Sequence, residues 1–121
     1  MTYAEGRRAA QAYGSMAVQT GIEAATPHRL VQMLMDGALE KMVAARGHMQ
    51  HGNIAEKGAN ISWAISIIEG MRASLDLEAG GEIARNLNDL YDYMGRRLLE
   101  ANMRNDAKAL EEVISLLREI K

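Results

Sequence analysis

Apolar residues recur every three or four positions along several segments of this chain. The clearest row follows the pair Gly80-Gly81 and comprises Ile83, Leu87, Leu90, Met94, Leu98 and Ala101. This spacing places the row on one face of a single long helix that begins near Glu82. The face carries only apolar side chains, so it predicts packing or the binding of an apolar partner rather than chemistry.

Three further segments show the same helical period. Thr26-Pro27 predicts a helix start, with Thr as N-cap and Pro at the first helical position, and His51-Gly52-Asn53 predicts the end of that helix. A second helix is expected from about Ile54 to Leu75, with Trp63 and Ile67 off its main stripe, and Asn105-Asp106 is expected to cap the last. The apolar rows are Leu30, Leu34, Ala38, Met42, Ala45 and Met49, then Ile61, Ile65, Ile68, Met71 and Leu75, and finally Leu110, Val113, Ile114, Leu117 and Ile120.

These four helices predict the fold class. No segment alternates apolar and polar residues with the period of a half-buried strand. Connections of only a few residues make sequential helices antiparallel. We therefore expect an all-α protein, an antiparallel up-down four-helix bundle over residues 26–121, within a single domain spanning 1–121.

The first 25 residues differ in kind, since they mix Ala, Gly and polar residues without a long apolar stripe. A short helix from about residue 3 to 13 and a frayed tail are both compatible with this composition. Four side chains are apolar enough to lie against the bundle: Tyr13, Met16, Val18 and Ile22. We treat them as candidates for an N-terminal strap that covers an apolar groove.

Glycine and methionine are unusually placed for an ideal bundle. Five glycines fall inside the expected helices, at positions 37, 47, 58, 70 and 95, where glycine costs about 1 kcal/mol relative to alanine. Close approach of crossing helices would explain them, and so would helices that open to admit a guest. The nine Met residues fit a plain core filler or a surface that adapts to irregular partners.

Composition excludes several classes of function. The absence of Cys rules out disulfides and thiolate chemistry, and a formal net charge of -2 argues against nucleic acid as the main partner. No apolar run approaches the roughly 20 residues of a membrane span, and no secretory signal begins the chain. We expect a cytoplasmic protein without membrane insertion.

Candidate catalytic and metal sites are weak. The histidines are His28, His48 and His51, and none follows a Glu by three residues, so the Glu-x-x-His pairs of di-iron bundles are absent. His48 and His51 share a helix face but lack a third ligand. Asp89 and Asp92, beside Tyr91 and Tyr93, suggest a polar helix flank. We expect no enzyme, no metal and no cofactor, with a bundle enzyme or metal carrier as a rival hypothesis.

Two stretches of the sequence resemble one known family. The first is Ala24-Ala25-Thr26-Pro27-His28-Arg29-Leu30, which continues into Met33-Leu34-Met35-Asp36-Gly37-Ala38-Leu39. The second runs from Leu75-Asp76 through Gly80-Gly81-Glu82 and includes Asn86-Leu87, Leu90-Tyr91-Asp92-Tyr93-Met94 and Leu98 to Asn102. Together they are similar to the motifs of the flagellar secretion chaperone family (FliS), over most of the chain from about Tyr13 to Lys121.

The resemblance implies a function and partners. Members of this family are non-enzymatic chaperones that bind the disordered C-terminal segment of flagellin, prevent its premature polymerisation and deliver it to the export gate of the flagellar type III secretion system. An apolar groove between helices suits such a client. Candidate groove residues are Ile61, Ile65, Ile68, Met71, Leu87, Leu90 and Met94. A weak homodimer stays open, as does a helical adaptor or regulatory protein without a client-shielding role.

Overall fold

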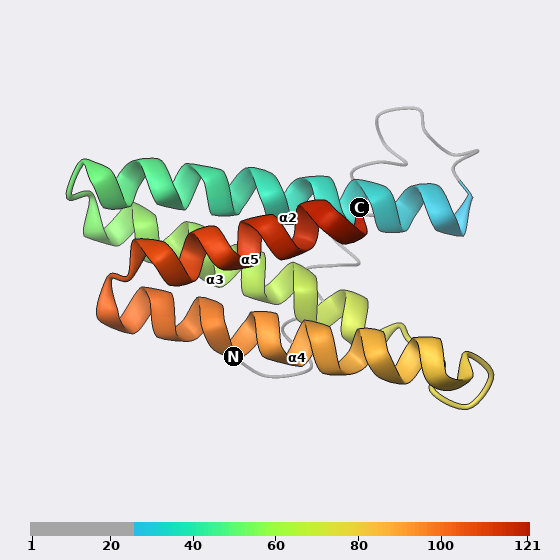
Figure 1. The fold of residues 1–121 in the computed structure, drawn as a ribbon. Coiled ribbons are helices and arrows are strands. Elements are labelled where there is room, and N and C mark those ends of the chain that lie inside the picture. Colours follow the sequence, from blue (N-terminus) through green and yellow to red (C-terminus); the bar gives the residue numbers. More distant parts are fainter. Residues whose placement is uncertain (1–25) are drawn as a thin grey trace.

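The computed structural model describes residues 26–121 as four helices (Figure 1). They are α2 (Pro27–Gln50), α3 (Ile54–Ala73), α4 (Gly81–Arg104) and α5 (Ala107–Ile120). No strand occurs within this range, so the predicted all-α bundle is confirmed. The four candidate strap residues Tyr13, Met16, Val18 and Ile22 lie outside the described residues.

The helices form a closed ring around one core. α2 packs against α3 and α5, and α4 packs against the same two helices, whereas the backbones of the diagonal pairs are not close neighbours. The largest fully buried side chains come from all four helices: Met42, Ile61, Ile67, Ile68, Met94, Leu98, Leu110, Val113, Ile114 and Leu117. No described helix combines the length and apolarity needed to span a membrane.

The predicted helix ends are confirmed by their capping contacts. Thr26 Oγ1 accepts a hydrogen bond from the Arg29 amide at 3.1 Å, which satisfies one free amide of the first turn of α2. Asp106 Oδ1 does the same for α5, accepting from the amides of Lys108 and Ala109 at 3.0 and 3.2 Å. Asn105 ends α4 in the left-handed region, with φ 52°. The α4–α5 connection is short because Asn105 ends α4 and the next residue, Asp106, caps the start of α5.

Two expectations about individual side chains were wrong. Ile83 is 74% exposed, because it lies in the first turn of α4, which projects beyond the end of α5 (Figure 1). Ile67, placed off the main stripe of its helix, is fully buried, since α3 packs against α2 and α4 and buries an arc wider than one stripe. Tyr91, which stands beside the polar pair Asp89 and Asp92 in the sequence, is 2% exposed, and burial raises the pKa of its hydroxyl.

Polar contacts join helices across the ring. Arg97 Nε donates to Glu112 Oε1 at 2.7 Å and Tyr93 donates to the same oxygen at 2.9 Å, linking α4 to α5. Both donors lower the pKa of the Glu112 carboxyl. Lys121 Nζ lies 2.6 Å from Asp36 Oδ1, which ties the end of α5 to α2. The Asp106 cap thus holds the start of α5, and the ion pair of Lys121 with Asp36 holds its end.

Candidate functional site

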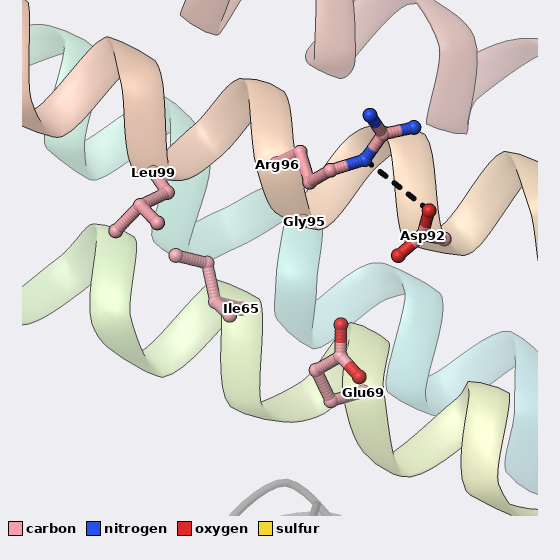
Figure 2. A pocket seen from close by; sticks show the side chains of 6 residues that line it. All are labelled: Ile65, Glu69, Asp92, Gly95, Arg96 and Leu99. Carbon is pink, nitrogen blue, oxygen red and sulfur yellow. Dashed lines mark ion pairs between the residues drawn. The ribbon is translucent and has the colours of Figure 1, made fainter. Parts of the chain in front are cut away.

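A hollow lies on the seam between α3 and α4 (Figure 2). Its volume is about 150 Å³. α3 contributes Ile65 and Glu69, whereas α4 contributes Asp92, Gly95, Arg96 and Leu99. Figure 2 shows the side chains of Ile65 and Leu99 directed toward one another at one end, and the Glu69 carboxylate directed toward Gly95.

Charged groups close one end of this hollow. Arg72 on α3 donates to Asp92 Oδ1 at 3.1 Å and to Asn88 Oδ1 at 2.9 Å on α4. Asp92 also accepts an ion pair from Arg96 Nε through its other oxygen, at 3.2 Å. Arg72 therefore joins the two helices at this end, and the position of the seam is fixed by polar contacts rather than by apolar packing alone.

A buried lysine joins the same helices at the other end. Lys57 is only 3% exposed, and its Nζ donates to the backbone carbonyl of Asn102 at 2.9 Å. Carbonyls in the last turn of a helix lack intrahelical partners and carry partial negative charge, so an ammonium group is well placed there. The hollow consequently lies between two polar fastenings of α3 to α4.

Leu99 lies between the two fastenings and Met103 lies just beyond the second, and both expose apolar side chains to solvent. Leu99 is 51% exposed and Met103 is 72% exposed. Gly95, Leu99 and Met103 are spaced by four, so they lie along one face of α4, spanning about 12 Å at 1.5 Å per residue. We call the apolar part of the lining of the hollow, formed by Ile65, Gly95 and Leu99, the α3–α4 groove. It carries no catalytic constellation.

A second incompletely covered apolar region lies at the end of the bundle that α5 does not reach. α5 has 14 residues and α4 has 24, so the N-terminal part of α4 extends past the end of α5 (Figure 1). Partly buried apolar residues of α2, α4 and α5 pack against the core here or near it: Val31, Leu34, Leu87, Leu90 and Ile120.

The seven groove candidates from the sequence fall into three groups. Ile61, Ile68, Met71 and Met94 lie in the core, at 2% exposure or less, and would meet a client only if helices parted. Ile65 lines the α3–α4 hollow. Leu87 and Leu90 are partly buried near the end of the bundle that α5 does not reach. The tertiary structure therefore does not bring the seven together on one surface.

Leu99 and Met103 were not among the candidates from the sequence, whereas Gly95 was noted as one of five glycines inside helices. Gly95, Leu99 and Met103 form a second row with spacing of four on α4, offset by one residue from the core row. The core row is longer and more regular, and it supplied all three candidates from this helix, Leu87, Leu90 and Met94. Leu98 and Leu99 illustrate the difference, since the first is fully buried and the second half-exposed.

Two of the three histidines, His48 and His51, make local contacts. His51 Nδ1 lies 2.8 Å from the carbonyl of Gly47, and His48 Nδ1 lies 3.3 Å from Asn53 Nδ2, so both stay at the end of α2. Within residues 26–121, no group of three His, Asp or Glu side chains is arranged to hold a metal ion.

Comparison with known proteins gives a consistent family. The sequence profile of the family described as "Flagellar protein FliS" matches residues 9–121. The flagellar secretion chaperone FliS of Salmonella typhimurium is 51% identical over 111 residues, covering 91% of this chain and 82% of that protein. FliSB of Pseudomonas aeruginosa is 48% identical over 114 residues, covering 94% and 90%. FliS of Vibrio cholerae is 44% identical over 115 residues, covering 95% and 85%.

Proposed function

This chain belongs to the FliS family of flagellar secretion chaperones, and we propose that it is the export chaperone for a flagellin. In this proposal it binds the disordered C-terminal segment of newly made flagellin in the cytoplasm. Binding prevents premature polymerisation, and the complex is delivered to the export gate of the flagellar type III secretion apparatus. The family is one of chaperones and not of enzymes. Family membership over residues 9–121 is the observation that carries the proposal.

The geometry supports a helical binding mode for the client. A disordered segment that folds on a carrier loses about 1–2 kcal/mol of backbone entropy per residue, so apolar contact area must compensate. The α3–α4 groove offers Leu99 already exposed, with Ile65 at its base, and the exposed Met103 follows one turn further along α4. An amphipathic helix with apolar residues at spacings of three and four would lay its apolar face along this strip.

The end of the bundle that α5 does not reach extends the proposed client surface. Leu87 and Leu90 are partly buried there, and a client long enough to continue past the α3–α4 groove would cover them. The residues Tyr13, Met16, Val18 and Ile22 are proposed to cover part of this apolar surface in the free protein. Such a cover has a physical reason, because large exposed apolar patches promote aggregation.

Calorimetry with a flagellin C-terminal peptide tests the proposal. We expect binding with a negative heat-capacity change from apolar burial, and a gain of helical circular dichroism on mixing, because the peptide is disordered alone. High salt should weaken the complex only modestly, since most of the contact is apolar.

Two outcomes would contradict the chaperone function. One is binding of polymerised filament without binding of the free peptide. The other is equally tight binding of a folded partner with no client ordering, which would favour the helical adaptor that the sequence left open. A scrambled peptide of identical composition is the control for non-specific apolar association.

A further inference from the structure

Gly95 occupies a position where the fold does not require glycine. Glycine is the least favourable residue other than proline in a helix interior. A Cβ atom at Gly95 would meet one atom within 4 Å, Glu69 Oε1 at 2.9 Å, which is the far end of a flexible side chain. At Gly80, by contrast, a Cβ would meet the backbone oxygen of Asp76 at 2.8 Å. Packing therefore explains Gly80, whereas the missing side chain at Gly95 keeps the hollow open.

The hollow has the size and walls to take one long side chain. Its volume of about 150 Å³ resembles that of an engineered protein cavity that accepts a benzene ring. Ile65 and Leu99 form an apolar end, and the Glu69 carboxylate stands on the other side of Gly95 (Figure 2). A side chain entering here would meet aliphatic carbon first and a carboxylate beyond it.

The two carboxylates beside the hollow are not equally neutralised. Both oxygens of Asp92 lie within ion-pair distance of an arginine, at 3.1 Å from Arg72 and 3.2 Å from Arg96. Among the described residues, Glu69 has one ion-pair contact, from Oε2 to Arg72 at 3.7 Å, which is too long for a hydrogen bond. The side chain of Glu69 is 19% exposed, so a donor reaching Oε1 would form its contact partly shielded from water.

We propose that this hollow is a specificity socket for one basic side chain, Arg or Lys, of the bound client helix. The aliphatic stem packs between Ile65 and Leu99, and the cationic tip donates a charge-assisted hydrogen bond to Glu69. Gly95 provides the space. The inference rests on the proposed function, since it names the client residue type that the α3–α4 groove recognises.

A double-mutant cycle in the full chain tests the socket. The probe is the flagellin C-terminal peptide, in which each Arg or Lys is replaced by Met in turn. We expect Glu69→Gln to weaken binding of the parent peptide about tenfold, and one peptide substitution to do the same. The two changes together should cost no more than either alone, because they remove the same contact. Glu111→Gln, an exposed carboxylate on α5, should leave the affinity unchanged.

A matched pair of glycine variants tests the space. Gly95→Ala should weaken binding several-fold while leaving the melting temperature unchanged or raised, since alanine favours the helix. Gly47→Ala, where a Cβ would meet nothing within 4 Å, should raise the melting temperature without changing affinity. A loss of affinity in Gly95→Ala with an intact fold separates occlusion of the socket from unfolding.

The outcomes distinguish the socket from the chaperone function itself. If the parent protein does not bind the peptide, both proposals fail. If it binds, but Glu69→Gln binds as tightly or its effect adds fully to every peptide substitution, the socket is wrong and the chaperone function stands. Coupling to an apolar peptide residue instead of a basic one would also overturn the socket.

Discussion

Leu98 and Leu99 are neighbours in sequence with opposite roles on α4. Leu98 is fully buried, whereas Leu99 is 51% exposed at the α3–α4 groove. Leu98→Ala should therefore lower the free energy of unfolding by about 2–5 kcal/mol, the cost of a core truncation that leaves a cavity. Leu99→Ala should lower it by less than about 1 kcal/mol and instead weaken peptide binding. Urea unfolding and calorimetry measure the two effects.

Ile83→Ala is the control for this pair. It truncates a large apolar residue of the same helix at 74% exposure, away from the α3–α4 hollow. Its stability should change by about 0.5 kcal/mol or less. Equal losses in Leu98→Ala and Leu99→Ala would mean that the buried face of α4 has been assigned incorrectly.

α5 is the shortest of the four described helices and depends on polar contacts with its neighbours. Arg97 and Tyr93 donate to Glu112, and these bonds lower the pKa of its carboxyl from the ordinary value of 4.5. A lowered pKa in the folded state means that the contact stabilises the protein above the ordinary carboxyl range. This stabilisation is lost as the pH falls through the lowered pKa of Glu112. The melting temperature of Glu112→Gln should thus lie below that of the parent at neutral pH and approach it in acid.

Salt and a neighbouring variant check the origin of that pH dependence. The Glu112 contact is solvent-exposed, so added salt should reduce the difference between parent and variant at neutral pH. Glu111→Gln on the same helix should show no comparable convergence in acid. A difference between Glu112→Gln and parent that is constant from pH 7 to strongly acidic pH would show that the carboxylate is not stabilised by its partners.

At the end of the bundle that α5 does not reach, Leu87 and Leu90 are only partly buried. We proposed that Tyr13, Met16, Val18 and Ile22 cover apolar surface in the free protein. If such a cover is open one-tenth of the time, the apparent affinity for a client falls about tenfold. Deletion of residues 1–18 should therefore tighten peptide binding by up to that factor and make the free protein more prone to aggregate. Calorimetry and light scattering measure both.

The same deletion would reveal either of two other roles for residues 1–18. Weaker peptide binding with unchanged solubility would mean that the segment contacts the client directly. Unchanged affinity and unchanged solubility would mean that it is an ordinary tail. Either result would end the covering hypothesis while leaving the α3–α4 groove untouched.

Local chemistry made most of the fold predictable. Thr26 and Asp106 cap their helices with side-chain oxygens, as their positions before apolar rows indicated. The site was less predictable, because the same apolar period describes a residue in the core and a residue at the edge of a groove. Of the seven candidates, Ile65 alone lines the α3–α4 hollow. The rows contained no information on how far each neighbouring helix extends.

The sequence by itself determined the helices, their order and the family, because capping and periodicity act within a few residues and a family motif is a property of the chain. Only the tertiary structure decided which apolar residues stay exposed. Ile83 projects past the end of α5, and Ile67 is enclosed because α3 has a neighbour on either side. Contacts such as that of Lys57 with Asn102 likewise join residues 45 positions apart. Such contacts depend on the offset at which two helices pack, and no local pattern encodes that offset.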